Sequence, residues 1–138
     1  MQREAEARHR KRAARDAQRA EQVIEEGKRY GATISTTQGD ISVELFVGES
    51  PVTTNNFAFL AKEGFYDDIR AFRVLDGFMA QMGIAGDPAK NARWSEKTIR
   101  DDPVRASNTR GMVTYAKTGA PNSRSTQIFI NFGNNARL

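Results

Sequence analysis

The sequence predicts a mainly β domain in which short antiparallel strands form a sheet or barrel with one helix over an open end. Two observations lead to this prediction. From residue 31 onward, short runs of alternating apolar and polar residues follow one another, and turn pairs such as Asp76-Gly77 separate them. Only residues 51–64 carry apolar residues near helical spacing. A chain of 138 residues is long enough for one such domain but not for two.

Residues 1–30 differ in composition from the rest and predict a charged, helical extension in front of a domain that spans residues 31–138. This segment contains nine Lys or Arg and six Asp or Glu, and it is rich in strong helix formers. Its larger apolar residues, Val23, Ile24 and Tyr30, are few, so we expect a solvated extension whose removal leaves the fold unchanged. Interleaved acids and the lack of aromatic residues beside the basic cluster weigh against a nucleic-acid-binding arm. A basic arm that recruits an acidic partner is the alternative.

The first elements of the domain are predicted to be a hairpin and then a helix. The segments ATISTTQ and ISVELF are joined through Gly39-Asp40, a pair typical of tight hairpin turns. Ser50 and Pro51 supply an N-cap and a proline at the first helical position, and Gly64 ends the helical pattern. We therefore expect two antiparallel strands followed by one helix.

Four more strands are predicted after the helix. The first two, FRVL and FMAQM, are split by Asp76-Gly77, and the last two, MVTYA and QIFINF, by the turn-rich segment TGAPNSRST. Between these pairs, residues 83–111 show only a long polar stretch.

The composition excludes several kinds of site. There is no cysteine, and the only histidine, His9, lies in the charged extension. Thiol chemistry, a Ser-His-Asp triad and a metal site built on several histidines are therefore excluded, and we expect neither metal nor cofactor. No apolar run is long enough to span a bilayer and no signal peptide is visible, so we expect a cytoplasmic protein without a membrane partner.

Three polar side chains stand inside apolar strands: Arg73, Gln81 and Gln127. Because side chains alternate between the two faces of a strand, Met79 shares a face with Gln81, and Phe129 shares one with Gln127. If these faces meet, an apolar floor is rimmed by one guanidinium and two carboxamides. Such a site donates hydrogen bonds but holds no nucleophile, since arginine stays protonated and glutamine does not ionise. From spacing alone, recognition of an amide and a structural role for the carboxamides both stay open.

Several motifs occur together in an order typical of one known family. The segment YDDIRAFRVLDGFMAQMG is similar to the pattern YDG-x-x-FHRV-x-x-GFMxQGGD, and APNSRSTQIFIN is similar to GPNxxxSQFFI. Upstream, TTQGDISVELFVGESPVTTNNFAFLAKEGFY is similar to a hairpin and helix of the same family. By these motifs, residues 31–138 resemble the cyclophilin-type peptidyl-prolyl cis/trans isomerases, and bacterial-type members most of all.

The resemblance implies a cyclophilin-like antiparallel β-barrel with a capping helix and a substrate groove on the outer face of the barrel. It places the catalytic arginine of the family at Arg73. The implied substrate-binding residues line a proline pocket, hydrogen-bond the peptide or form the neighbouring subsite, and they are Phe78, Met79, Gln81, Thr118, Gly119, Gln127, Phe129 and Leu138. Arg137 stands where many members carry a tryptophan.

The implied reaction is rotation about X-Pro bonds in proline-containing peptides and unfolded proteins, without metal or cofactor. Rotation destroys amide resonance and meets a barrier of about 18–20 kcal/mol. As the bond twists, the proline nitrogen gains a lone pair to which a fixed guanidinium can donate, whereas the planar amide offers none. The residue types of the predicted site therefore suit this reaction.

The chain ends at Leu138, where the family continues through further strands and a second helix. We therefore expect a barrel that is incomplete at the C-terminus. The alternatives to an active isomerase are a module that binds proline-containing peptides without catalysis and an inactive truncated fragment.

Overall fold

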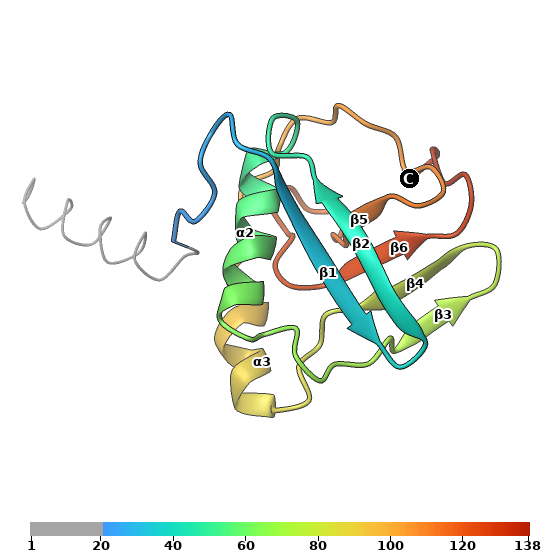
Figure 1. The fold of residues 1–138 in the computed structure, drawn as a ribbon, viewed down its shortest axis with the longest axis horizontal. Coiled ribbons are helices and arrows are strands. Elements are labelled where there is room, and N and C mark those ends of the chain that lie inside the picture. Colours follow the sequence, from blue (N-terminus) through green and yellow to red (C-terminus); the bar gives the residue numbers. More distant parts are fainter. Residues whose placement is uncertain (1–20) are drawn as a thin grey trace, which may run out of the picture.

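The computed structural model describes residues 21–138, which fold into six strands and two helices (Figure 1). In chain order the elements are β1 (Tyr30–Thr36), β2 (Gly39–Leu45), α2 (Pro51–Lys62), β3 (Arg73–Leu75), β4 (Met79–Met82), α3 (Pro88–Ser95), β5 (Val113–Tyr115) and β6 (Ile128–Asn131). All pairings are antiparallel: β1 pairs with β2, and a second sheet has the strand order β3-β4-β6-β5. The mainly β class predicted from the sequence is confirmed.

The β1–β2 hairpin forms where the alternating pattern predicts it, but its turn lies earlier in the chain. Thr36 pairs with Gly39, so the two turn residues are Thr37 and Gln38, and Gly39 already belongs to β2. The Thr36 hydroxyl closes the turn: it donates to the Gly39 carbonyl at 2.6 Å and accepts from the Gln38 N–H at 3.1 Å. The prediction of a turn at Gly39-Asp40 is therefore wrong by two residues.

Helix α2 begins and ends where the sequence predicts, but its N-terminus is capped from a distance. Pro51 is the first helical residue, and Ser50 makes no side-chain capping bond. Instead, the Asp102 carboxylate accepts from the N–H groups of Val52 at 3.2 Å and Thr53 at 2.8 Å. A carboxylate at this end satisfies N–H groups that have no partner within the helix and suits the helix dipole. The loop that carries Asp102 is thereby tied to α2.

Gly64, two residues after the last helical residue, terminates α2, as predicted. Gly64 has a φ of +73°, its N–H donates to the Ala61 carbonyl at 3.1 Å, and the Phe65 N–H donates to the Leu60 carbonyl at 2.9 Å. These two bonds form a Schellman motif, which favours glycine because of its left-handed backbone.

Helix α3 lies within residues 83–111, where the sequence analysis found only a polar stretch. Asp87 caps it by accepting from the Ala89 N–H at 3.0 Å, and Pro88 occupies the first helical position. Trp94 is buried and packs edge-on against Phe59 of α2, with ring centroids 5.1 Å apart. The Asp87-Pro88 pair carries the same start signal as Ser50-Pro51, but too few apolar residues follow it to reveal a helical period.

The core lies in two clusters on either side of α2. One gathers Phe59, Leu60, Phe65, Ala85 and Trp94 between α2 and α3. The other joins Phe57 of α2 to Tyr115 and Ile128 on one face of the four-stranded sheet. That face of the sheet is therefore its inner face.

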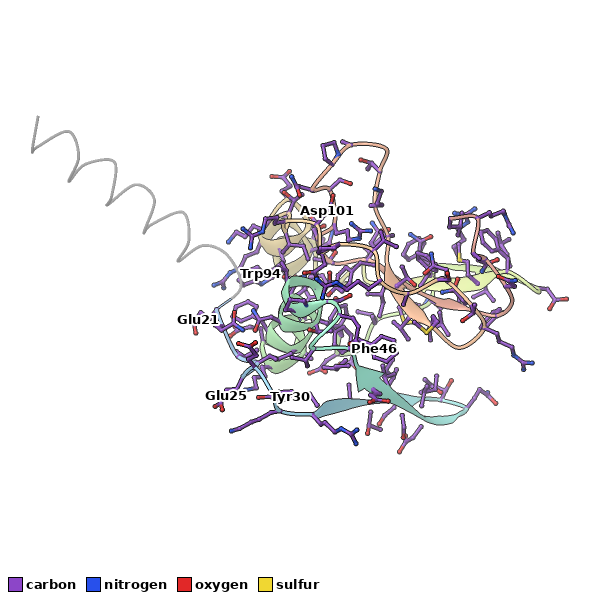
Figure 2. The ribbon with its side chains drawn as sticks, turned by 90° about the horizontal axis from the view of Figure 1, so that it is seen from above. Glu21, Glu25, Tyr30, Phe46, Trp94 and Asp101 are labelled. Atoms are coloured by element: carbon purple, nitrogen blue, oxygen red, sulfur yellow. The ribbon has the colours of Figure 1, made fainter. Side chains whose placement is uncertain are left out.

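A cavity of about 600 Å³ opens between the hairpin and the four-stranded sheet. Figure 2 shows the two sheets as separate layers, with both helices to one side of them. Within residues 21–138, no strand pair joins one sheet to the other. The barrel is therefore open, in agreement with the incomplete barrel expected from the sequence. No helix in this part of the chain has the length and apolar character that crossing a bilayer requires.

The segment that leads into β1 packs against the domain. Residues 21–29 form no helix, Ile24 is only 4% exposed, and Val23 packs against the cluster around Trp94. The Asn55 side chain of α2 accepts from the Val23 N–H at 2.8 Å and from the Ile24 N–H at 3.1 Å. It also donates to the Glu21 carbonyl at 3.0 Å.

The expectation of a helical, solvated extension is therefore wrong for residues 21–29, because Ile24 is buried and the Asn55 side chain of α2 binds their backbone. That the fold is unchanged when these residues are removed stays a prediction. The same expectation for residues 1–20 lies outside the described residues.

We expect Ile24→Ala to lower the free energy of unfolding by about 2 kcal/mol, because it removes a buried side chain and leaves a cavity beside α2. Urea unfolding followed by Trp94 fluorescence measures this change. Glu26→Ala, at an exposed position in the same segment, is the control and should leave the midpoint unchanged. Equal midpoints for both variants would show that the docked segment contributes nothing to stability.

Candidate active site

The strand register brings Arg73, Gln81 and Phe129 into one row across three neighbouring strands. Arg73 of β3 lies directly opposite Gln81 of β4, and Gln81 lies opposite Phe129 of β6. Directly opposite residues project from the same face, with Cβ atoms about 4.5–5.5 Å apart. The faces that the sequence analysis could only suppose to meet therefore do meet.

This row lies on the outer face of the four-stranded sheet. Ile128, next to Phe129, is 2% exposed and belongs to the core, so the side chain of Phe129 must project the other way. Arg73 is exposed, while Gln81 and Phe129 are half-buried. Neither of the two ion pairs within residues 21–138 involves Arg73. The strand therefore places the backbone of Arg73, and its guanidinium takes part in neither of these ion pairs.

Gln81 and Gln127 form a hydrogen-bonded pair beside Arg73. The Gln81 Nε2 donates to the Gln127 Oε1 at 2.8 Å. This bond sets the orientation of both carboxamides. It uses one N–H of Gln81 and one oxygen lone pair of Gln127. Each side chain keeps further donors and acceptors with which to bind a ligand.

The apolar part of the predicted site surrounds the same row. Met79 shares the outer face with Gln81 and sits diagonally from Phe129, but it is only 4% exposed. Phe78 lies in the turn before β4, where its carbonyl accepts from the Phe132 N–H at 2.9 Å. The Arg137 guanidinium lies 5.6 Å from the centroid of the Phe78 ring. A cation over this ring covers the end of the apolar surface.

Sequence reasoning missed the asparagine that holds the chain beside Phe78. Asn135 is 2% exposed, and its Nδ2 donates to the Phe78 carbonyl at 3.0 Å and to Asn131 Oδ1 at 2.8 Å. The only signal in the sequence was a cluster of asparagines, which is equally typical of a loop. Burial, which the sequence does not show, decides that Asn135 is structural support for the site.

Two parts of the predicted site lie away from the row. Thr118 and Gly119 belong to an exposed loop, residues 117–124, in which the Thr118 N–H donates to the Ser123 hydroxyl at 3.0 Å. Leu138 is 61% exposed and lines the cavity between the two sheets, to which Arg73, Gln81 and Phe129 do not contribute. The roles of these three residues in substrate binding stay predictions.

Asp101 anchors the loop of residues 117–124. Its N–H donates to Asn122 Oδ1 at 2.8 Å, its Oδ2 accepts from the Asn122 N–H at 2.9 Å, and the Arg124 guanidinium donates to its other oxygen. The backbone N–H of Asn122, together with the charge of Arg124, holds the pKa of Asp101 below its ordinary value.

Because the folded pKa of Asp101 is lowered, its bonds stabilise the loop at neutral pH and are lost as the pH falls below about 4 and through the folded pKa. We expect the Asn122 amide resonance to move in an acid titration followed by ¹⁵N NMR. Asp101→Asn should abolish this pH-dependent step. A step that persists in the variant would mean that another group titrates beside the loop.

The chemistry of this face is hydrogen bonding and apolar contact. Within residues 21–138 no group of three His, Cys, Asp or Glu side chains is placed to hold a metal ion. The row and the adjoining Gln127 offer one cation, two carboxamides and an aromatic ring, which can bind an amide and respond to a change in its charge distribution.

Comparisons with known proteins place this arrangement in a family. Residues 32–138 match the family model described as cyclophilin type peptidyl-prolyl cis-trans isomerase. Peptidyl-prolyl cis-trans isomerase B of Escherichia coli is 36% identical over 104 residues, a match that covers 75% of this chain and 63% of that protein. Peptidyl-prolyl cis-trans isomerase cypE of Dictyostelium discoideum is 36% identical over 107 residues, covering 73% of this chain and 66% of the relative.

A solved structure agrees with the sequence matches. The cyclophilin type peptidyl-prolyl cis-trans isomerase of Cryptosporidium parvum superposes with a TM-score of 0.70 at 27% identity, covering 80% of this chain and 72% of that one. The chain thus spans less than two thirds of the length of the Escherichia coli relative. With the family model matched from β1 to Leu138, the chain belongs to the cyclophilin-type peptidyl-prolyl cis-trans isomerases.

Proposed function

We propose that this protein accelerates rotation about X-Pro peptide bonds, with Arg73 as its catalytic residue. The observation that carries the proposal is the row in which Arg73, Gln81 and Phe129 lie opposite one another on three paired strands. Family membership supplies the reaction class, and the row supplies a cation beside carboxamides and an aromatic surface. The residues needed to grip a prolyl peptide and to stabilise its twisted state are thus within reach of one ligand.

The proposed mechanism depends on a donor that binds the twisted amide better than the planar one. In the planar amide the nitrogen lone pair is delocalised, which is the origin of the barrier of about 18–20 kcal/mol. As the bond rotates, the nitrogen pyramidalises and its lone pair becomes an acceptor for an N–H of Arg73. An interaction that is stronger in the transition state than in the ground state lowers the barrier. Arginine suits this task because it stays protonated at any relevant pH.

The other residues of the site hold the peptide while its bond turns. Phe129, with Phe78 and Met79 nearby, offers apolar surface to the proline ring. The bonded pair of Gln81 and Gln127 offers its remaining polar atoms to the peptide backbone. The Cryptosporidium parvum isomerase, solved in the presence of the dipeptide Ala-Pro, superposes with a TM-score of 0.68 at 27% identity. Short proline-containing peptides, and unfolded proteins that display the same bonds, are accordingly the proposed substrates.

The test is exchange NMR on an Ala-Pro peptide, whose uncatalysed isomerisation takes on the order of 10–100 s. Two polypeptides are compared: the 138-residue chain, and a chimera in which the C-terminal segment of the Escherichia coli relative follows Leu138. We expect catalysed exchange in at least the chimera, where the added segment can cover the cavity between the two sheets.

Each outcome of this experiment has a distinct meaning. Exchange in the chimera alone would show that the site is correct and that the 138-residue chain is by itself an inactive fragment. Peptide binding without accelerated exchange, in both folded polypeptides, would replace catalysis with the non-catalytic binding module. Neither binding nor exchange in both folded polypeptides would overturn the proposal.

A further inference from the structure

The two residues in front of Gln127 are held by hydrogen bonds from distant parts of the chain. Asn56 Nδ2 of α2 donates to the Ser125 carbonyl at 2.7 Å, and the Tyr66 hydroxyl donates to the Thr126 carbonyl at 2.9 Å. The hydroxyl of Thr126, which is 1% exposed, donates to the Gly83 carbonyl at 2.9 Å. Three anchors therefore fix the backbone that leads into Gln127.

Tyr115, which is buried, and Tyr66, which is half-buried, extend this network into a chain of hydrogen bonds with one direction. The Tyr66 and Tyr115 hydroxyl oxygens lie 2.8 Å apart, and Asn56 Nδ2 donates to the Tyr115 oxygen at 3.3 Å. Because Tyr66 gives its proton to Thr126, the hydroxyl of Tyr115 is the donor to Tyr66. Burial raises the pKa of both tyrosines, so both hydroxyls stay protonated.

Gly83 permits the close approach on which the third anchor depends. An added Cβ at this residue would lie 2.4 Å from the Thr126 carbonyl oxygen and 2.6 Å from the Gln127 Cα. Gly83 directly follows β4, the strand that carries Gln81. It therefore packs directly against Gln127, whose side chain is hydrogen-bonded to Gln81. A shift of the Ser125–Thr126 backbone would move one partner of that pair relative to the other.

We infer that Asn56, Tyr66 and Thr126 are positioning residues for the glutamine pair: they hold the Ser125–Thr126 backbone so that Gln127 meets Gln81 in the geometry that binds the substrate peptide. The inference rests on the proposed isomerase function for its effect on turnover. The part of the inference that concerns the placement of Gln127 can be tested whether or not the protein is active. Displacements of about 1 Å in a binding group are enough to weaken catalysis strongly.

The experiment removes one hydroxyl at a time from the full chain. Thr126→Val and Tyr66→Phe keep the shape of each side chain but delete its donor. Thr126→Ser restores the first donor, and Tyr30→Phe removes a hydroxyl that accepts only locally, from the Glu25 N–H. NMR records the side-chain amide resonances of Gln81 and Gln127, and exchange measurements give kcat/KM per folded molecule.

We expect Thr126→Val and Tyr66→Phe to move both glutamine amide resonances and to lower kcat/KM about fivefold, the order expected for one lost positioned hydrogen bond. Thr126→Ser and Tyr30→Phe should match the unmodified protein in both measurements. If Thr126→Val does not fold, Tyr66→Phe decides the matter, since its ring keeps the contacts with Phe57 and Phe65.

Unmoved glutamine resonances and an unchanged kcat/KM in the folded variants would overturn the inference and leave the network with a purely structural role. Absence of catalysis in both the unmodified chain and its chimera with the Escherichia coli segment would count against the proposed function alone. The amide resonances would then decide the inference by themselves.

Discussion

Replacing Arg73 with alanine is expected to lower kcat for X-Pro isomerisation by about 10²–10³, the usual cost of losing one transition-state donor. Affinity for the peptide should change little, because the guanidinium donates to a lone pair that exists only in the twisted state. The fold should also be retained, since Arg73 is exposed and takes part in neither ion pair within residues 21–138. Exchange NMR gives the rate, and a titration with the same peptide gives the dissociation constant.

The matched variant is Arg73→Lys, which keeps the positive charge but loses the planar fork of donors. We expect it to recover only part of the rate, because a shorter ammonium group reaches the nitrogen with poorer geometry. A parallel loss of binding and turnover in Arg73→Ala would make the residue a ground-state contact. A rate equal to that of the unmodified protein would remove Arg73 from the mechanism.

Gly83→Ala is expected to lower the free energy of unfolding by about 3 kcal/mol, because the new Cβ meets backbone that cannot move aside. The nearest atoms would be the Thr126 carbonyl oxygen at 2.4 Å and the Gln127 Cα at 2.6 Å. The residue also has a φ of +113°, which side-chain-bearing residues rarely adopt. Urea unfolding with a tryptophan signal measures the loss.

Gly86→Ala is the control for this change, since it lies three residues further along and an added Cβ there meets nothing within 4 Å. Its unfolding midpoint should stay within experimental error of the unmodified protein. If Gly83→Ala were equally harmless, the contact between the end of β4 and the Thr126–Gln127 backbone would have to be looser than the structure describes.

Much of the fold could be predicted because it depends on residues that are close together in the sequence. Alternation of polar and apolar residues placed the strands, Ser50-Pro51 and Gly64 bounded α2, and Asp76-Gly77 formed the turn between β3 and β4. The rule that side chains alternate faces also predicted that Arg73, Gln81 and Phe129 could share a surface. The cytoplasmic location expected from the sequence and the character of residues 1–20 stay predictions.

The elements that sequence reasoning missed depend on contacts between distant residues. Asp102 caps α2 in place of Ser50, and Asn55 docks Ile24, although roughly fifty and thirty positions separate the partners. Helix α3 is stabilised by packing Trp94 against α2 rather than by a repeating apolar pattern. No local pattern in the sequence indicates these pairings, because each partner alone has an ordinary composition around it.

The residue types of the site, the strands that carry them and the family motifs from Thr36 to Asn131 could all be read from the sequence. Only the folded chain shows the register that sets Arg73 opposite Gln81, the pairing of Gln81 with Gln127, and the three hydrogen bonds that hold the backbone before Gln127. The physical reason is that alternation fixes only which face a side chain takes. Which side chain it meets there depends on how strands far apart in the chain are aligned, and that alignment is set by hydrogen bonds and close packing across the whole domain.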